Sequence, residues 1–263
     1  MNAQPPLEAI LRWYLDAGVD EAIGETPIDR YASAPPTPPP APAERPAAPR
    51  FAPTPEPVAA APVESSAHAA FAATSLAELR AVVESFEGCP LKLTARSTVF
   101  GAGAVNARLM VVGEAPGEEE DRQGLPFVGP SGKLLDRMLD SIGLSRERDV
   151  HIANVLPWRP PANRTPTPAE VGQCLPFIER HIELIDPAML LVLGGAAAQA
   201  LLGKSDSIGR LRGRWLAYSS TRLPRPIPAL ATYHPAFLLR TPAMKRDVWK
   251  DFLMLRKRLE QKN

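Results

Sequence analysis

Three short segments of the sequence carry side chains suited to chemistry, and each follows an apolar run. They are GEAPG at residues 113–117, a segment that begins at Asn154, and HPAFLLR at residues 234–240. Together they offer carboxylates, an amide and an imidazole, which bind polar substrates and move protons. The amide of Asn154 could read the edge of a base or of a substrate amide. The ordinary alternatives are a strand-to-helix connection at GEAPG and a hydrogen-bonded turn histidine at His234.

Four apolar runs predict the strands that must position these segments. They cover residues 109–113, 150–156, 188–193 and 227–232, and helical patterns alternate with them along the chain. This alternation indicates a parallel sheet covered on both faces. We therefore predict an α/β fold, a three-layer α/β/α arrangement whose central sheet is four-stranded and mostly parallel. The carboxyl ends of parallel strands share one edge, so the three segments can converge there.

The composition divides the chain into three parts. Apolar side chains at helical spacing in residues 7–23 predict an amphipathic helix within residues 1–31, a candidate segment for binding a protein partner. Residues 32–63 contain 12 prolines, a density that excludes helix and sheet and predicts an extended linker over residues 32–73. Residues 74–263 form the predicted globular domain.

Charge and cysteine usage bound the class of protein. Residues 201–263 carry 14 basic and 4 acidic side chains, a balance of +10 that suits a polyanion such as nucleic acid, although a solvated basic helix would look the same. The sequence shows no apolar run long enough to span a membrane and no secretory signal. Two cysteines in 263 residues indicate a reducing compartment, so we expect a cytoplasmic protein.

Three ordered motifs resemble those of a known enzyme family. GEAPGEEEDRQGLPFVGPSGKLLDRML, NVLPWRPPANRTPTPAE and HPAFLLR are similar to the motifs of the family 4 uracil-DNA glycosylases, in the family's order and spacing. The resemblance implies the fold of those enzymes over residues 74–263. It also implies a monomeric hydrolase, associated with the nucleoid, that flips uracil out of single- or double-stranded DNA. Such an enzyme cuts the N-glycosidic bond and leaves an abasic site for base excision repair.

The resemblance assigns roles to residues around the base. Phe127 corresponds to the aromatic residue that stacks on uracil, and Asn154 to the residue that bonds its pairing edge. His234 corresponds to the donor near O2, where negative charge grows as the base leaves. Glu114 and Glu120 correspond to acids that position water or stabilise an oxocarbenium-like sugar, and the neighbouring acids leave the choice between them open. Further contacts to the base are expected from Gly113, Ala115 and Gly117.

The resemblance also implies contacts to DNA outside the base pocket. Leu238 lies four residues after His234, where related enzymes insert a wedge into the space that the base leaves. Contacts to the DNA backbone suit the basic C-terminal segment. They are expected from Arg240, Lys245, Arg164 and Ser131.

The cysteines depart from the family's pattern. Family 4 enzymes usually hold a [4Fe-4S] cluster with four cysteines, and such a cluster requires four thiolates. Cys89 and Cys174 occupy two of these positions, whereas Phe86 and Trp158 occupy the other two. We therefore expect no metal and no other cofactor. Our hypothesis is that packing of the two aromatic side chains has replaced the structural role of the cluster.

Two other functions compete with this interpretation. A homologue that lost catalysis along with its cluster would bind DNA or a protein partner, although the base-binding residues are intact. A nucleotide-binding enzyme would use the GEAPG loop for phosphate, but the four acids that follow would repel phosphate, and no P-loop or dinucleotide motif is present.

Related enzymes that become covalently linked to uracil-DNA carry a basic, histidine-containing insert after the strand that bears the asparagine. RPPANRTP stands there in this chain, so we expect turnover rather than trapping.

Overall fold

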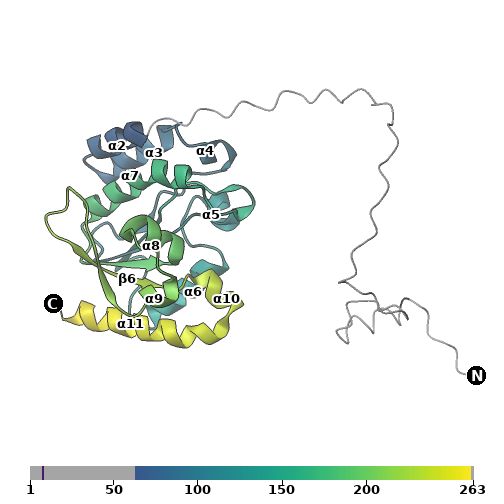
Figure 1. The fold of residues 1–263 in the computed structure, drawn as a ribbon, viewed down its shortest axis with the longest axis vertical. Coiled ribbons are helices and arrows are strands. Elements are labelled where there is room, and N and C mark those ends of the chain that lie inside the picture. The colour runs from purple at the N-terminus through teal and green to yellow at the C-terminus, as the bar shows by residue number, and fades with distance from the viewer. Residues whose placement is uncertain (1–7, 9–62, 262–263) are drawn as a thin grey trace, which may run out of the picture. The chain divides into compact units, whose positions relative to one another are not determined.

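The computed structural model describes Glu8 and residues 63–261 (Figure 1). The chain divides into two units, Met1–Thr54 and Pro55–Asn263, and the second holds all the described residues except Glu8. The predicted helix of residues 7–23, apart from Glu8, and the proline-rich part of the predicted linker lie outside the described residues. Within the described ranges, no helix is both long enough and apolar enough to cross a membrane.

A six-stranded mixed sheet forms the centre of the second unit. Its strand order is β1-β3-β2-β4-β6-β5, and the four inner strands run parallel. Most side chains of the inner strands are buried, as expected for a parallel sheet covered on both faces. These four are the strands that the apolar runs predicted: β2 Leu109–Gly113, β3 Val150–Asn154, β4 Met189–Leu193 and β6 Ile227–Thr232.

The prediction of a four-stranded sheet is wrong because each edge carries a further antiparallel strand. Strand β1, Ala102–Gly103, pairs with β3, and strand β5, Trp215–Tyr218, pairs with β6. Strand β1 has only two residues, and in β5 only Tyr218 is buried. Neither strand therefore produces the buried apolar run by which central strands are recognised in a sequence.

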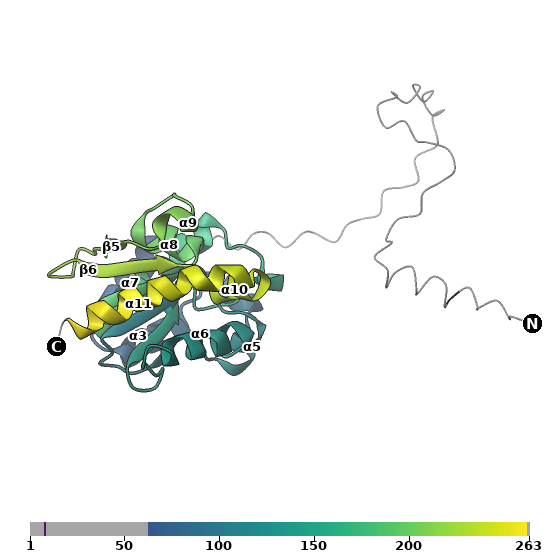
Figure 2. The same ribbon diagram turned by 90° about the horizontal axis from the view of Figure 1, so that it is seen from below.

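Helices cover both faces of the sheet and give the three predicted layers (Figures 1 and 2). One core joins the sheet to α2, α3, α7 and α8, and the other joins it to α6, α10 and α11. A short 3-10 helix, η2, separates α10 from α11, so the last helix begins at Lys245. The helices are α2 Val63–Ala72, α3 Leu76–Ser85, α4 Leu91–Thr94, α5 Glu118–Gln123, α6 Pro130–Asp140, η1 Pro161–Asn163, α7 Pro168–Ile185, α8 Gly195–Leu202, α9 Ile208–Leu211, α10 Pro235–Arg240, η2 Pro242–Met244 and α11 Lys245–Glu260.

Residues 63–72, which the composition placed in the linker, form helix α2. Two arginines attach its C-terminal end to the domain: Arg180 donates to the carbonyl of Ala73, and Arg222 donates to the carbonyl of Phe71, both at 2.9 Å. The proline-rich run ends at Pro62, and the alanine-rich sequence beyond it favours a helix. The folded unit therefore begins before the predicted boundary at residue 74.

Side chains cap the N-terminus of helix α7. Thr167 Oγ1 accepts the N–H of Glu170 at 3.2 Å, and the Glu170 carboxylate accepts the N–H of Thr167 at 2.7 Å. Pro168 occupies the first helical position. This capping box fixes the helix end that carries Glu170 beside the functional site.

Candidate active site

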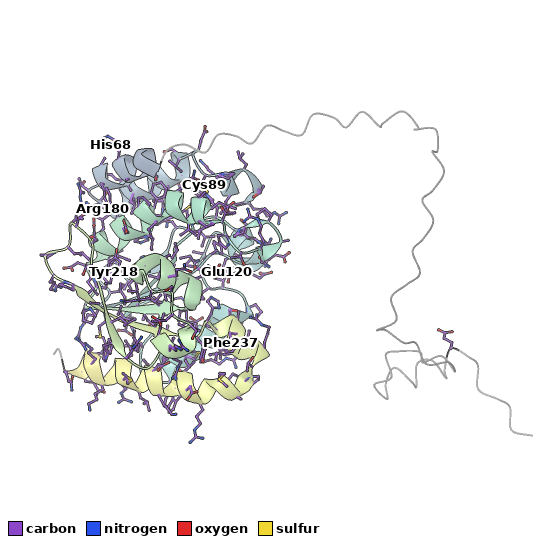
Figure 3. All side chains as sticks on the ribbon, in the orientation of Figure 1. His68, Cys89, Glu120, Arg180, Tyr218 and Phe237 are labelled. Carbon is purple, nitrogen blue, oxygen red and sulfur yellow. The ribbon has the colours of Figure 1, made fainter. Side chains whose placement is uncertain are left out.

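The carboxyl ends of β2, β3 and β6 meet around a cavity of about 640 Å³. The GEAPG loop follows β2, Asn154 ends β3, and His234 follows β6, so the structure brings together the three segments that the sequence predicted to converge. Glu120 of α5 and Phe237 of α10 also line the cavity. Both side chains are labelled in Figure 3. The predicted residues Ala115 and Gly117 lie in its lining.

Asn154 presents an unpaired amide oxygen to this cavity. The residue is 5% exposed, and its Oδ1 has no hydrogen-bond partner among the described residues. An unpaired buried polar atom costs free energy, so this oxygen is suited to accept a hydrogen bond from a ligand. Gly113 is its register partner in β2, and because it has no side chain it leaves room for the Asn154 amide.

Phe127 turns its ring toward the cavity from an uncommon backbone conformation. Its φ is 53°, in the left-handed region that residues with a side chain rarely adopt. The ring centroid lies 5.5 Å from that of His234, with 33° between the two planes. A Cβ at Gly132 would lie 1.8 Å from the Phe127 carbonyl oxygen, so this turn can pack on the start of α6 only when residue 132 is glycine.

The tautomer of His234 follows from its hydrogen bond. Its Nδ1 accepts the backbone N–H of Ala236 at 3.1 Å, and an accepting nitrogen carries no proton. The neutral ring therefore bears its proton on Nε2 and can donate it. Burial, and then the charge of Arg240, lower the pKa of His234 to about 4, against the smaller opposing effect of Glu120. The ring is neutral at pH 7.

Glu120 supports the turn that carries Phe127 through hydrogen bonds to its backbone. Its Oε1 accepts the N–H groups of Val128 at 2.9 Å and Gly129 at 2.8 Å, and the residue is 9% exposed. Two donors on one carboxylate oxygen fix its orientation. This carboxylate therefore supports the turn that carries Phe127, a task that its position in the sequence did not reveal.

The remaining acids of this region differ in their surroundings. Asp121 Oδ1 accepts the backbone N–H groups of Arg96 and Ser97, while Glu118 and Glu119 form ion pairs at the surface with arginines. Glu114 lines the cavity, and burial raises its pKa above the usual value. No hydrogen bond to the Glu114 carboxylate occurs within the described part of the chain, so this carboxylate is the one most available to a substrate.

Comparison with known proteins shows which family the chain belongs to. The family model described as the uracil DNA glycosylase superfamily matches residues 100–253. A type-4 uracil-DNA glycosylase from Archaeoglobus fulgidus is 42% identical over 182 residues, which are 68% of this chain and 90% of the relative. The chain belongs to the uracil-DNA glycosylase superfamily.

Further relatives place the chain among the type-4 members of that superfamily. The type-4 enzyme from Thermotoga maritima is 41% identical over 64% of this chain and 86% of the relative. That from Pyrobaculum aerophilum is 37% identical over 68% of this chain and 92% of the relative. The motifs that carry the resemblance are therefore those of a type-4 uracil-DNA glycosylase, and the six-stranded α/β/α fold is the fold of this member of the superfamily.

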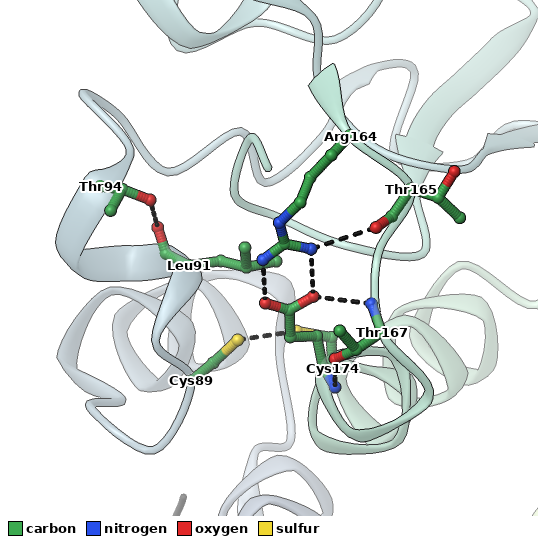
Figure 4. Close-up of polar contacts among 8 residues, drawn as sticks. Cys89, Leu91, Thr94, Arg164, Thr165, Thr167 and Cys174 are labelled. Atoms are coloured by element: carbon green, nitrogen blue, oxygen red, sulfur yellow. Dashed lines mark hydrogen bonds and ion pairs between the residues drawn. The ribbon is translucent and has the colours of Figure 1, made fainter. Parts of the chain in front are cut away.

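Arg164 lines the cavity, but its guanidinium already forms hydrogen bonds within the protein. Its guanidinium binds Glu170 through two bonds, at 2.6 and 2.9 Å, and donates to the carbonyl of Thr165 at 3.1 Å (Figure 4). Glu170 is 5% exposed, and the hydrogen bond from Arg164 lowers its pKa. This pair anchors the loop of residues 160–164 to the start of α7. Arg164 is therefore less free to contact a DNA phosphate than we expected from the sequence.

The other predicted DNA contacts fall into two groups. Arg240 and Ser131 line the cavity, and Lys245 is exposed at the start of α11. Leu238, in contrast, is fully buried in the core beneath α10, whereas its neighbour Leu239 is 45% exposed. The helical turn after Pro235 directs Leu238 away from the cavity, so it cannot act as a surface wedge in this conformation.

The residues at the four cluster positions do not fit an iron–sulfur cluster. The Sγ atoms of Cys89 and Cys174 lie 3.8 Å apart and both residues are buried (Figure 4). At the other two positions, the rings of Phe86 and Trp158 stack with centroids 6.5 Å apart. Trp158 also donates to Thr98 Oγ1 at 3.0 Å. Two thiols offer half of the required ligands, and in the described ranges no group of three or more His, Cys, Asp and Glu could hold a metal ion.

Proposed function

We propose that the protein hydrolyses the N-glycosidic bond between uracil and deoxyribose in DNA and leaves an abasic site, as a monofunctional glycosylase of base excision repair. The observation that carries the proposal is the unpaired, buried Oδ1 of Asn154, in the lining of a cavity that also offers an aromatic ring and a neutral imidazole donor. The type-4 relatives support the same activity.

Recognition of the base rests on Asn154 and Phe127. Uracil presents a donor at N3 and an acceptor at O4, and the Asn154 amide offers the complementary acceptor and donor. The ring of Phe127 offers an apolar face to the base. Stacking and hydrogen bonding together offset the cost of taking the nucleotide out of the duplex, which is a few kcal/mol.

Bond cleavage rests on His234 and Glu114. As the base departs, negative charge develops on its O2, and the Nε2 proton of neutral His234 is available to bond it. A single donor of this kind in a dry site contributes roughly 10²- to 10³-fold in rate. The carboxylate of Glu114 stabilises the positive charge that develops on the sugar and orients the attacking water. As the water oxygen bonds to the sugar carbon, Glu114 accepts its proton, and the uracil anion that leaves is later protonated by solvent. Glu120 acts through the Phe127 turn rather than on the sugar.

The activity is tested with single-stranded and duplex oligonucleotides that contain one uracil, followed by alkali to break abasic sites. We expect strand cleavage at the uracil and free uracil as the product. Glu114→Gln should lower the rate roughly 100-fold or more, whereas Glu118→Gln, which alters an exposed carboxylate nearby, should leave it unchanged. No cleavage in either type of DNA would favour the alternative, a binding-only homologue.

We also propose that the protein works without a [4Fe-4S] cluster and without other cofactors. The stacked pair of Phe86 and Trp158 supports this, because the two aromatic side chains occupy the positions of the missing ligands. Iron and acid-labile sulfide are to be assayed in protein purified without oxygen. A cluster present in near-stoichiometric amount would refute the proposal.

The proposed partners follow from the same site. The substrate is uracil-containing DNA, single- or double-stranded, and the protein acts as a monomer in the cytoplasm, close to the nucleoid. Residues 7–23 are proposed to bind a protein partner. Turnover is expected, because the loop after Asn154 contains no histidine that could trap the sugar. A stable covalent adduct with uracil-DNA on a denaturing gel would contradict this.

A further inference from the structure

The turn that carries Phe127 is held from two sides by charged side chains. Arg146, in the loop between α6 and β3, donates from Nη1 to the carbonyl of Pro126 at 2.7 Å and from Nη2 to the carbonyl of Phe127 at 2.5 Å. Glu120 accepts the next two backbone N–H groups of the turn. Four successive residues thus have a backbone group bound to a charged side chain.

Arg146 is itself fixed in position. Its Nε and Nη2 donate to Oδ1 of Asp136 on α6, at 2.9 and 2.8 Å, and its side chain is only 15% exposed. A planar guanidinium can bind two carbonyl oxygens and a carboxylate in one fixed arrangement. A lysine ammonium is a single point and cannot reproduce it.

The turn requires this support because of the backbone conformation at Phe127. A φ of 53° is disfavoured for a residue with a side chain and persists where the surroundings hold it in place. This conformation directs the ring into the cavity, 5.5 Å from His234. If the two hydrogen bonds from Arg146 to the backbone carbonyls were lost, the backbone could relax toward an ordinary conformation and carry the ring away from the base.

We propose that Arg146 is a positioning residue, which holds the ring of Phe127 in the place where it stacks on the flipped base. The inference rests on the proposed function, since the ring has this use only in an enzyme that binds uracil. Arg146 is absent from the cavity lining, so it acts through Phe127 and not on the substrate. Its contribution to the rate should therefore depend on the presence of the ring.

The dependence is tested by a double-mutant cycle under single-turnover conditions. Arg146→Lys is expected to lower the rate of uracil release by about tenfold or more, because the stacking surface is displaced. Arg148→Lys, an exposed arginine two residues further on, is the matched control and should leave the rate unchanged. In a Phe127→Leu background, Arg146→Lys should cost less than about twofold. Equal losses in the two backgrounds would overturn the proposal.

A second measurement follows the ring without any activity. In protein labelled with fluorophenylalanine, the fluorine resonance that disappears in Phe127→Leu reports on this residue. Arg146→Lys is expected to shift or broaden that resonance, and Arg148→Lys is not. An unchanged resonance would refute the proposal, and because the measurement uses no uracil, its failure is distinct from that of the proposed function. If Arg146→Lys does not fold, Asp136→Ala, which removes the acceptor of two guanidinium hydrogen bonds, is measured with the same expectations.

Discussion

A Cβ added at Gly113 would lie 2.5 Å from Oδ1 of Asn154, its partner in the neighbouring parallel strand. The same atom would lie 2.6 Å from Cζ of Phe127. The glycine is therefore required by the positions of two other side chains, the one proposed to bond the base and the one proposed to stack on it. Although Gly113 is not part of the cavity lining, it controls the shape of the cavity.

Gly113→Ala should reduce uracil excision by about 100-fold or more without unfolding the protein, because a shift of about 1 Å in the base-binding groups is enough to cost that much. The matched control is Gly195→Ala at the start of α8, where a Cβ would approach Ile208 no closer than 4.0 Å. The rate is measured on a single-uracil oligonucleotide and folding by circular dichroism. Normal activity in Gly113→Ala would show that the pocket is more adaptable than this geometry allows.

Asn154→Asp should alter the choice between bases. The carboxylate cannot donate to uracil O4, but it can accept from the amino group of cytosine, so uracil excision should fall by about 100-fold while cytosine excision becomes detectable. Both rates are measured on oligonucleotides that differ only in the target base. Asn163→Asp, at a second asparagine of the cavity lining, is the control and should not change the ratio. Unchanged selectivity in Asn154→Asp would show that Asn154 does not bind the pairing edge of the base.

The sequence predicted the site to the extent that the parallel sheet determines it. Asn154 and His234 follow or end buried apolar runs, and the carboxyl ends of parallel strands share one edge. Their convergence therefore required no knowledge of side-chain contacts. The role of Arg146 could not be found in this way, because its partners are backbone carbonyls that lie 19 and 20 residues away in the chain.

The direction of a side chain on a short helix could not be predicted from the sequence either. Leu238 and Leu239 are adjacent leucines, and only the phase of the helix after Pro235 decides that the first is buried and the second exposed. The edge strand Trp215–Tyr218 escaped prediction because a half-exposed strand has little apolar periodicity. Sequence patterns report burial averaged over an element, whereas these features depend on the contacts of single residues.

Trp158, at one of the positions where the resemblance implies a cluster cysteine, should contribute strongly to the stability of the fold. Its side chain is 1% exposed and packs on Phe86, so Trp158→Ala should lower the free energy of unfolding by about 3–5 kcal/mol. Trp249→Ala, at an exposed tryptophan of α11, is the matched control and should cost less than about 1 kcal/mol. Both values come from urea unfolding. Equal small losses would contradict the hypothesis that aromatic packing has replaced the cluster.

Two buried histidines predict how stability depends on pH. Nε2 of His151 and Nε2 of His181 lie 2.9 Å apart, and His151 Nδ1 lies 3.1 Å from the carbonyl oxygen of Ala104. His151 therefore donates to that carbonyl, and the Nε2 atom of its neutral ring can accept from Nε2 of His181. If both rings were protonated, two donors would face each other at this contact. Burial is the largest cause that lowers the pKa of each ring, and the charge of nearby Arg80 lowers both further.

The sign of the effect follows from proton uptake. With folded pKa values below the ordinary 6.5, both histidines take up protons in the unfolded chain first, so their contribution is complete above that pH and is lost as the pH falls below it. The loss cannot exceed about 1.4 kcal/mol per pH unit for each histidine. Urea unfolding at pH 7.5 and 5.5 measures it. His151→Gln combined with His181→Gln should remove most of this slope and leave the part due to His234, whereas His68→Gln, at an exposed histidine, should retain it. The same slope in the double variant would show that other groups are responsible.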